Sequence, residues 1–237
     1  MEEKIYILST RPLPQSILDE AEGQHVQIDT ISFIHTEPII NNELKQQLIS
    51  FFSKQLVAVF TSMNAVEAVA ACSSGQKPAW KIFCIGDTTA ALIREYFGQN
   101  SIAGTAQSAI ELADVIIDAG VEQAVFFCGD MRRPELPDKL SANNIALEEI
   151  MVYKTIATPK QVENNYDGIL FFSPSAAESF FAANTVKSNA VLFAIGDTTA
   201  STIQRFTGNA IVTGARPGKE MLAQQAIAYF KSIRALR

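Results

Sequence analysis

The segment CIGDTTA at residues 84–90 recurs as AIGDTTA at residues 194–200, an offset of 196 − 86 = 110 positions. A hydroxyl-rich segment precedes each copy: FTSMNAVE at residues 60–67 aligns with FFSPSAAE at residues 171–178, an offset of 173 − 62 = 111 positions. Both pairs place small polar residues where an apolar run gives way to a helical pattern. At such a position the free backbone N–H groups of a first helical turn can hold an anion.

The repeat continues downstream and decides the number of domains. Residues 104–116 align with residues 214–227 near the same offset, so three segments match in the same order. This predicts a duplicated unit of about 110 residues. A chain of 237 residues suits one large or two small domains, and the repeat favours two.

Short apolar runs alternate with amphipathic stretches along the chain, which is typical of parallel sheets flanked by helices. We predict strands at residues 5–8, 56–60, 81–85, 125–128, 168–172 and 191–195. We predict helices at residues 14–22, 41–54, 64–71, 88–97, 109–119, 176–183, 198–206 and 219–234. The expected fold is α/β, with two similar lobes that are each a parallel sheet flanked by helices, joined by a two-stranded β-ribbon.

The two lobes are not simple halves of the chain. The first copy ends in FFCGDMRRP at residues 126–134, and its best counterpart is ILSTRP at residues 7–12. One lobe is therefore expected to be inserted into the other. The predicted parts are a discontinuous lobe of residues 1–33 and 156–237, an inserted lobe of residues 38–150, and inter-lobe crossings at residues 34–37 and 151–155. Residues 26–34 and 150–156 are rich in β-branched side chains and are expected to form the ribbon.

Composition excludes several classes of function. A net charge of −6, from 19 basic and 25 acidic residues, argues against nucleic-acid or anionic-membrane binding driven by charge. A polyanionic small molecule stays open because helix N-termini and a few arginines bind such a ligand locally. The sequence shows neither a signal peptide nor an apolar run of the roughly 18 residues that span a bilayer, so a cytoplasmic location is expected.

The cysteines and histidines give no convincing metal site. The three cysteines have no CxxC spacing, and only two histidines are available to complete a zinc site. Cys84 and Cys128 lie in apolar runs and are expected to be buried free thiols. No metal and no cofactor is predicted, and the absence of Walker A and GxGxxG patterns gives nucleotide binding little support.

The duplicated Gly-Asp-Thr-Thr turns have two interpretations. One is helix capping by Asp or Thr, which stabilises a helix by about 1 kcal/mol and needs no ligand. The other is anion binding, since Thr88-Thr89 and Thr198-Thr199 lie beside free amides that suit carboxylate or phosphate oxygens. Capping requires one such residue, whereas here the whole tetrapeptide is duplicated.

The serines also precede helices and also have two interpretations. Ser62, Ser173 and Ser175 suit either capping or hydrogen bonding to a ligand. A nucleophilic serine is not favoured, because the sequence has no GxSxG elbow. Arg11 and Arg132 follow predicted strands, where a guanidinium can bind a carboxylate, although a plain surface charge is the alternative. Tyr153 lies in the second crossing, where it serves either as packing or as a proton donor.

The chain resembles the uroporphyrinogen-III synthase family. The resemblance rests on STRP at residues 9–12, FTS at residues 60–62, VYKT at residues 152–155, FSPSA at residues 172–176 and the two IGDTT turns. It spans the whole chain, and it depends on the order and spacing of motifs that are each weakly specific. FFCGDMRRP is only a loose version of the family's strand and basic loop, and the Asp of each turn lies beside the expected anion site.

The resemblance implies two α/β lobes joined by a β-ladder, with the active site in the cleft. It also implies a cofactor-independent cyclising lyase (a hydro-lyase) of porphyrin and haem biosynthesis. The substrate is then hydroxymethylbilane, a linear tetrapyrrole polycarboxylate. Loss of its terminal hydroxyl as water gives an azafulvene, which closes through a spiro intermediate to uroporphyrinogen III with ring D inverted. The protein mainly has to select a geometry, because the free bilane closes without inversion.

The residues then receive expected roles. Tyr153 is the candidate catalytic acid. The expected substrate-binding residues are Arg11, Ser62, Thr88, Thr89, Arg132, Ser173, Ser175, Thr198 and Thr199. No nucleic-acid or membrane partner is expected, and a transient contact with the preceding bilane-forming enzyme is a further expectation. Two alternatives stay open: a two-lobed binding or sensor module for an anionic metabolite, and a catalytically idle relative used for protein contact.

Overall fold

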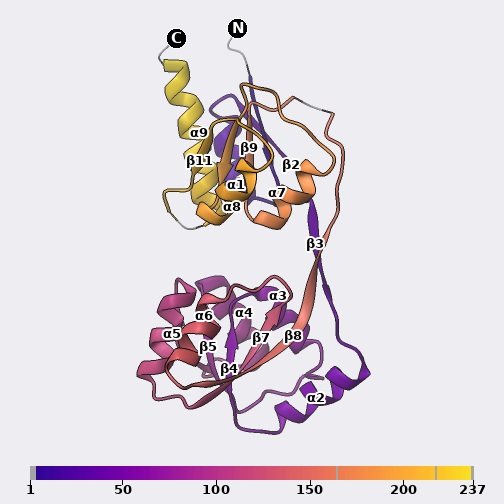
Figure 1. Cartoon of the computed structure of the whole chain (residues 1–237), viewed down its shortest axis with the longest axis vertical. Helices are drawn as coiled ribbons and strands as arrows, with labels where there is room; N and C mark the ends of the chain where they lie inside the picture. The colour runs from indigo at the N-terminus through magenta and orange to yellow at the C-terminus, as the bar shows by residue number, and fades with distance from the viewer. Residues whose placement is uncertain (1–3, 164, 217, 236–237) are drawn as a thin grey trace. The chain divides into compact units, whose positions relative to one another are not determined.

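The computed structural model describes residues 4–163, 165–216 and 218–235. The chain divides into two compact units, which we call unit 1 and unit 2. Unit 1 comprises the described residues of Met1–His35 and Ile156–Arg237, and unit 2 comprises Thr36–Thr155. The chain therefore passes from unit 1 to unit 2 and back again, and each unit has its own sheet and core (Figure 1).

Unit 1 is a five-stranded sheet in the order β11-β10-β9-β1-β2. The strands are β1 Ile5–Ser9, β2 Val26–Thr30, β9 Gly168–Phe171, β10 Val191–Ala194 and β11 Ile211–Thr213. All four neighbouring pairs are parallel. The prediction of a parallel sheet is confirmed for this unit.

Helices cover both faces of the sheet in unit 1. They are α1 Gln15–Glu22, α7 Pro174–Phe181, α8 Asp197–Gln204 and α9 Lys219–Ala235. One core cluster joins Ile7 and Phe193 of the sheet to Ile17 of α1 and Leu222 of α9. The other cluster contains side chains from α7 and α8 and strand residues such as Leu8. Because side chains alternate along a strand, Ile7 and Leu8 belong to opposite faces of the sheet.

Unit 2 is a six-stranded sheet in the order β3-β8-β7-β4-β5-β6. The strands are β3 Ile34–Pro38, β4 Val57–Phe60, β5 Lys81–Ile85, β6 Ile102–Ala106, β7 Gln123–Gly129 and β8 Ala146–Ala157. The pairs among β4, β5, β6, β7 and β8 are parallel. The helices are α2 Asn42–Phe52, α3 Met63–Ala70, α4 Asp87–Phe97, α5 Ala109–Asp118 and α6 Glu135–Ala142. One core cluster joins α2, α3 and α4 to the sheet, and the other joins α5 and α6 to it.

The two sheets have the same strand order. The order β6-β5-β4-β7-β8 in unit 2 corresponds to β11-β10-β9-β1-β2 in unit 1. In this correspondence β1, from the start of the chain, occupies the place that β7 occupies in unit 2. The sequence match between residues 126–134 and 7–12 is therefore a match between strands at equivalent positions.

Two details of the predicted topology need correction. The first ribbon segment was expected at residues 26–34, but Val26–Thr30 pairs with β1 inside the sheet of unit 1. The segment that pairs with β8 is Ile34–Pro38, and this pair forms the edge of the sheet in unit 2. Residues 26–30 include the β-branched residues Val26, Ile28 and Thr30, which suit either an inter-lobe ribbon or the sheet of unit 1. The parallel pairing with β1 buries Val26. The pattern did not predict β6, β11 and α6, which are short or weakly periodic.

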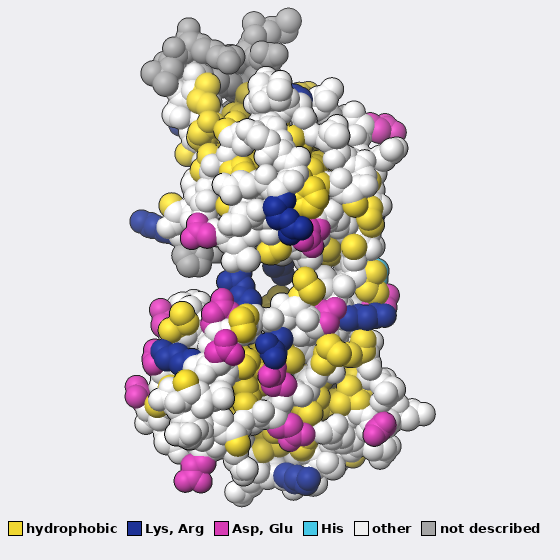
Figure 2. Space-filling model, viewed as in Figure 1, with side chains coloured by type: hydrophobic (Ala, Val, Ile, Leu, Met, Phe, Trp, Pro, Cys, Tyr) yellow, Lys and Arg dark blue, Asp and Glu magenta, His cyan; other side chains and the backbone are white. Residues whose placement is uncertain are grey.

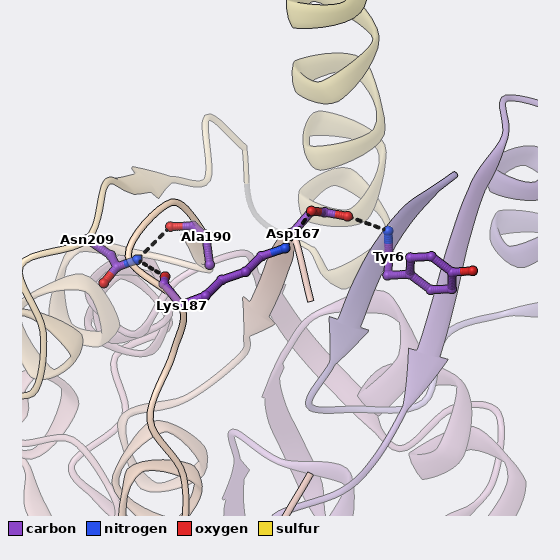
Figure 3. A network of polar contacts seen from close by, with 5 residues as sticks. All are labelled: Tyr6, Asp167, Lys187, Ala190 and Asn209. Carbon is purple, nitrogen blue, oxygen red and sulfur yellow. Dashed lines mark hydrogen bonds and ion pairs between the residues drawn. The ribbon is translucent and has the colours of Figure 1, made fainter. Parts of the chain in front are cut away.

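A polar network fastens the edge of unit 1 at which its strands begin (Figure 3). The Asp167 carboxylate accepts a hydrogen bond from the Tyr6 backbone N–H at 2.8 Å. It also forms an ion pair with Lys187, whose Nζ donates to it at 2.7 Å. The Asn209 side chain donates to the carbonyl oxygens of Lys187 and Ala190 at 2.7 and 2.9 Å. These contacts connect β1, β9 and the loops around β10, so they stabilise the amino edge of the sheet.

All three cysteines are free and buried. Burial raises the pKa of the Cys84 and Cys128 thiols to about 11, because the apolar surroundings disfavour the thiolate. Both thiols are therefore protonated at neutral pH and unsuited to nucleophilic catalysis. The described helices include none that is long and apolar enough to cross a membrane.

Candidate active site

The carboxyl edge of the sheet in unit 2 contains a cavity of about 420 Å³. Parallel strands direct all their carboxyl ends to one edge, and ligands of such sheets bind there. The cavity is lined from the ends of β4, β5, β6, β7 and β8, and its polar lining consists of Thr61, Ser62, Gln107, Ser108, Arg132, Arg133 and Tyr153. Of the predicted site residues, Ser62, Arg132 and Tyr153 thus line one hollow.

The ring of Tyr153 lies against the backbone of Gly129. The two residues are partners in the β7–β8 pairing, at a register shift between Cys128 and Gly129. A Cβ atom on residue 129 would lie 2.4 Å from Tyr153 Cζ and 2.8 Å from its hydroxyl oxygen. Only glycine therefore leaves room for this ring position, and the shifted register pairs Tyr153 with the last residue of β7.

The loop after β7 is bound to β8 at Tyr153 and at Thr155. The Asp130 backbone N–H donates to the Tyr153 carbonyl oxygen at 3.2 Å. The Asp130 carboxylate accepts from the Thr155 backbone N–H at 2.9 Å. Val152 is fully buried and Met151 is 47% exposed, so these neighbouring residues of β8 lie on opposite faces of the sheet. Tyr153 itself is half-buried, so its ring packs on the core while its edge lines the cavity.

Arg132 lines the cavity but already has an anionic partner. Its guanidinium forms a two-point contact with Glu149 of β8, with Nη2 donating to Oε1 at 2.9 Å and Nε paired with Oε2. Such bidentate pairs are the strong form of arginine–carboxylate contact. A substrate carboxylate at Arg132 would therefore have to share the guanidinium with Glu149 or displace it.

The Gly-Asp-Thr-Thr turn of unit 2 opens α4 without a side-chain cap. Gly86 is the N-cap residue, with φ +79°, and no side chain accepts a hydrogen bond there. Asp87 and Thr88 are exposed, whereas Thr89 is only 5% exposed. Capping by Asp or Thr, the first interpretation of this motif, is therefore wrong here. The N–H groups of the first turn keep the partial positive charge of a helix N-terminus.

The copy in unit 1 opens α8 in the same way. Gly196 is the N-cap residue and again no side chain caps the helix. Asp197 and Thr198 are exposed and Thr199 is 1% exposed. Thr199 Oγ1 is buried and has no hydrogen-bond partner among the described residues. The two turns thus present the same exposed pair, Asp-Thr, and bury the same second threonine.

The serines, in contrast, are helix caps. Ser62 Oγ accepts from the Asn64 backbone N–H at 3.1 Å, and Ser173 Oγ accepts from Ala176 N–H at 3.1 Å. Ser173 Oγ also lies 3.1 Å from Ser175 Oγ. The capping interpretation is confirmed for Ser62 and Ser173. A capping hydroxyl still has its own proton to donate, so hydrogen bonding to a ligand stays a prediction for them.

The first strand of unit 1 ends in hydroxyls that bind backbone carbonyl groups of the same unit. Ser9 Oγ donates to the Arg11 carbonyl oxygen at 2.5 Å, and Thr10 Oγ1 donates to the Leu170 carbonyl oxygen at 2.8 Å. These two side chains are buried, while Arg11 beyond them is exposed. Ser9 and Thr10 therefore shape the strand end, and Arg11 is the residue of this segment that solvent reaches.

A family model described as uroporphyrinogen-III synthase HemD matches residues 17–224 of the chain. This chain belongs to the uroporphyrinogen-III synthase family. As a member it is a cyclising lyase of porphyrin biosynthesis, and the family substrate is a small tetrapyrrole molecule. No protein of curated function matches the sequence significantly.

Two solved structures of uroporphyrinogen-III synthases share the fold. The enzyme from Helicobacter pylori is 14% identical, with a TM-score of 0.67 over 95% of this chain and 99% of that one. A mutant enzyme from Thermus thermophilus is 12% identical, with a TM-score of 0.62 over 98% of this chain and 99% of that one. At this identity the likeness concerns the fold, and the family assignment depends on the sequence match.

The predicted site residues of this uroporphyrinogen-III synthase fall into two sets. Unit 2 carries Ser62, Thr88, Thr89, Arg132 and Tyr153, and unit 1 carries Arg11, Ser173, Ser175, Thr198 and Thr199. In unit 2 the cavity is lined by Ser62, Arg132 and Tyr153, whereas Thr88 and Thr89 begin the helix that follows another lining residue, Ile85. Tyr153 lies within β8, and every other residue of the two sets follows a strand of its sheet or lies at the start of the next helix.

Gln107, Ser108 and Gly129 line the cavity and were not among the predicted site residues. Gln107 and Ser108 follow β6, and Ser108 caps α5 by accepting from Glu111 N–H at 3.2 Å. They lie in the third repeated segment, residues 104–116, so the repeat itself was the signal that could have found them. Gly129 had no such signal, because its importance comes from contact with a residue of the neighbouring strand.

Proposed function

We propose that this uroporphyrinogen-III synthase closes hydroxymethylbilane by binding its carboxylates at both Gly-Asp-Thr-Thr turns while Tyr153 assists departure of the terminal hydroxyl. The observation that carries the proposal is the equivalence of the two turns. Each has an uncapped helix N-terminus with an exposed threonine, at the edge of its sheet where the strands end. Because the substrate is a polycarboxylate, each turn would offer a site to one of its carboxylates.

The binding role differs between the two threonines of each turn. Thr88 and Thr198 are exposed, so their hydroxyls as well as their backbone N–H groups are open to a carboxylate. Thr89 and Thr199 are buried, so we assign them a contact through the backbone N–H. An anion at an uncapped helix N-terminus is stabilised by free donors and by the helix dipole. The exposed Asp87 and Asp197 carboxylates are expected to turn away from the bound anion.

The catalytic role is assigned to Tyr153 because it lines the cavity and carries an O–H donor. Its proton passes to the terminal hydroxyl of the bilane, the carbon–oxygen bond breaks, and water leaves. The resulting azafulvene is attacked by the substituted position of ring D, and the spiro intermediate then fragments and closes again with that ring inverted. Loss of a proton from the closed ring balances the one that Tyr153 supplied. No cofactor takes part in the proposed reaction.

Ser62, Ser173, Ser175, Arg11 and Arg132 are proposed as secondary contacts. The capping serines can donate their remaining proton to a carboxylate oxygen. Arg11 offers an exposed guanidinium at the end of β1. Arg132 is expected to contribute less, since Glu149 already binds it.

The setting proposed for this activity is the cytoplasm. Three free, buried cysteines fit a reducing compartment. The net charge of −6 gives no support to a nucleic-acid partner. We further propose a transient contact with the bilane-forming enzyme, because a substrate that closes spontaneously benefits from a short transfer.

The test is incubation with freshly prepared hydroxymethylbilane, followed by oxidation and separation of the porphyrin isomers. We expect the type III isomer in large excess. It should form faster than the type I isomer forms without protein, and EDTA should not change its rate of formation. Type I alone, at the rate seen without protein, would show that the chain is a binding module or an idle relative. A catalytically inactive control, such as heat-denatured protein, sets the uncatalysed rate.

A further inference from the structure

Unit 2 has a second cavity, at the opposite edge of its sheet from the candidate active site. It measures about 690 Å³ and is lined by the first residues of β4, β5, β7 and β8 together with the end of α2 and the segment that follows it. In Figure 1 strands β4, β7 and β8 run away from the edge near which α2 lies. The residues of the cavity all belong to unit 2, and none of them lines the cavity that contains Tyr153.

The apolar wall of this cavity is held in place by aromatic contacts. The Trp80 indole N–H donates to the Phe51 carbonyl oxygen at 3.0 Å, which fixes the end of α2 to the segment before β5. The Phe51 ring, 8% exposed, packs edge-on against Phe127 with ring centroids 6.2 Å apart. Leu56 and Leu147 add partly buried apolar surface. The cavity is therefore preformed, and its volume lies within the range of small-molecule sites.

Two lysines give the cavity a positive rim. Lys54 follows α2, and its Nζ lies 5.6 Å from the centroid of the Phe51 ring. Lys81 is the first residue of β5 and also lines the cavity. Within the described part of the chain, neither ammonium has a carboxylate within 4 Å. The acidic lining residue, Glu148, accepts a hydrogen bond from Gln47 at 3.1 Å.

We infer that this cavity is a second ligand site, for an amphipathic organic anion with a flat apolar body and one acidic group. The apolar body would lie against Phe51, Leu56 and Leu147, and the acidic group would reach Lys54 and Lys81. On the face seen in Figure 2, hydrophobic side chains reach the surface of unit 2. Basic and acidic side chains lie beside them, so this unit exposes apolar surface next to charge. A polycarboxylate substrate suits this cavity less well, because Glu148 would repel further acidic groups.

The test uses 8-anilinonaphthalene-1-sulfonate as the probe, because it has an aromatic body and a single anionic group. We expect saturable binding to the native protein at one site, followed by its fluorescence. Lys54→Gln and Lys81→Gln are each expected to weaken binding by about 1.5- to 5-fold, the size of one exposed charge contact. Ala146→Trp places a large side chain at an exposed lining position and is expected to remove most of the binding.

Matched controls separate this site from unfolding and from the candidate active site. Lys77→Gln removes an exposed lysine that does not line the cavity, and Thr88→Ala changes the turn that opens α4. Both should bind the probe as the wild type does, and thermal unfolding of every variant should match the wild type. Binding that is absent, or that is unchanged in Lys54→Gln, Lys81→Gln and Ala146→Trp, would overturn the inference. The isomer assay is independent of this result, so the two proposals can fail separately.

Discussion

The two Gly-Asp-Thr-Thr turns share their sequence and their exposure but not their backbone. Gly86 has φ +79°, in the region that favours glycine, whereas Gly196 has φ −176° and is extended. Even so, both turns leave the helix uncapped, expose Asp and the first threonine, and bury the second. The property that the two copies share is the surface offered to a ligand, while the path of the chain into the turn differs.

The strand ends differ more than the turns. In unit 2 Tyr153 of β8 lies beside Gly129 at the end of β7 and lines a cavity, and this glycine makes room for its ring. In unit 1 the strand equivalent to β8 is β2, and the strand equivalent to β7 is β1. The hydroxyls of Ser9 and Thr10, at the end of β1, bind backbone carbonyl groups of unit 1. Under the proposed function, both units contribute carboxylate-binding turns, and the assigned proton donor, Tyr153, belongs to unit 2.

Tyr153→Phe tests that asymmetry most directly. Removing one general acid typically lowers the rate by about 10²- to 10⁴-fold, and we expect a loss of this size in the formation of the type III isomer. Substrate binding should change little, because the ring and its packing remain. Initial rates at several bilane concentrations separate kcat from KM. A variant with wild-type rate and isomer purity would remove Tyr153 from the chemistry.

Gly129→Ala should impair the same step through the position of the tyrosine ring. The new Cβ would lie 2.4 Å from Tyr153 Cζ, so the ring has to move, and a displacement of about 1 Å can cost about 10²-fold in rate. The effect should be on kcat rather than on KM.

A double-mutant cycle shows whether Gly129 acts through Tyr153. In a Tyr153→Ala background the ring is absent, and Gly129→Ala should then cause no further loss. Additive losses would mean that Gly129 has a separate role. Gly196→Ala is the matched control from unit 1, because its Cβ meets no heavy atom within 4 Å.

The buried thiols provide a pH test that applies to unit 2 alone. Cys84 occupies the position of Ala194 in the other copy, and burial raises the pKa of its thiol from 9.0 to about 11. The folded state favours the neutral thiol, so its stabilisation is complete below pH 9 and is lost as the pH rises toward 11. A pKa shift of this size corresponds to a loss of about 2–3 kcal/mol in the free energy of unfolding once the pH exceeds 11.

Cys84→Ala converts this segment into the sequence of unit 1 and is expected to flatten the alkaline loss of stability. Urea unfolding at pH 8 and at pH 10.5 measures the loss of stability in the variant and in the wild type. Tyrosine and lysine residues contribute equally to both proteins, so their contribution cancels in the comparison. An equal loss of stability in the variant and the wild type would show that another group is responsible.

Thr88→Ala and Thr198→Ala compare the two turns as substrate contacts. Each variant removes one hydroxyl but keeps the backbone N–H groups, so we expect KM to rise by about tenfold in both, the value of one hydrogen bond to a charged group. Isothermal titration with a bilane that lacks the terminal hydroxyl would measure binding without turnover. If only one variant loses affinity, the turns do not share the ligand.

The repeat explains why the fold was predictable from the sequence. Strands β5 and β10 and the uncapped turns after them lie within the duplicated segments, so the position of Thr88 and Thr198 at strand ends followed from the pattern. Alternation along β8 also places Tyr153 on the face opposite the buried Val152. These features depend on local sequence and on alternation, which one chain reveals.

The features that escaped prediction depend on contacts between distant residues. The pairing of Arg132 with Glu149 and the approach of Gly129 to Tyr153 arise from the register of β7 against β8, which local sequence does not specify. Residues 26–30 suit a ribbon or a sheet equally, and their pairing with β1 is a property of the whole unit. Capping was also undecided by sequence: serine caps α3 and α7, yet Asp caps neither α4 nor α8.

The smallest expected effect concerns the backbone difference between the two turns. Gly86→Ala places a Cβ at φ +79°, which costs about 1–2 kcal/mol in the left-handed region, although open space surrounds it. Gly196→Ala is extended and equally open, so we expect a change within about 0.5 kcal/mol. Urea unfolding of the two variants measures both changes in the free energy of unfolding.

The two variants should also differ in KM. In Gly196→Ala the exposed threonine and the N–H groups of the turn stay in place, so KM should match the wild type. In Gly86→Ala the first turn of α4 shifts, so KM should rise. Equal destabilisation by the two substitutions would mean that the backbones of the turns are alike in solution, and that the duplication preserved the chain path as well as the surface.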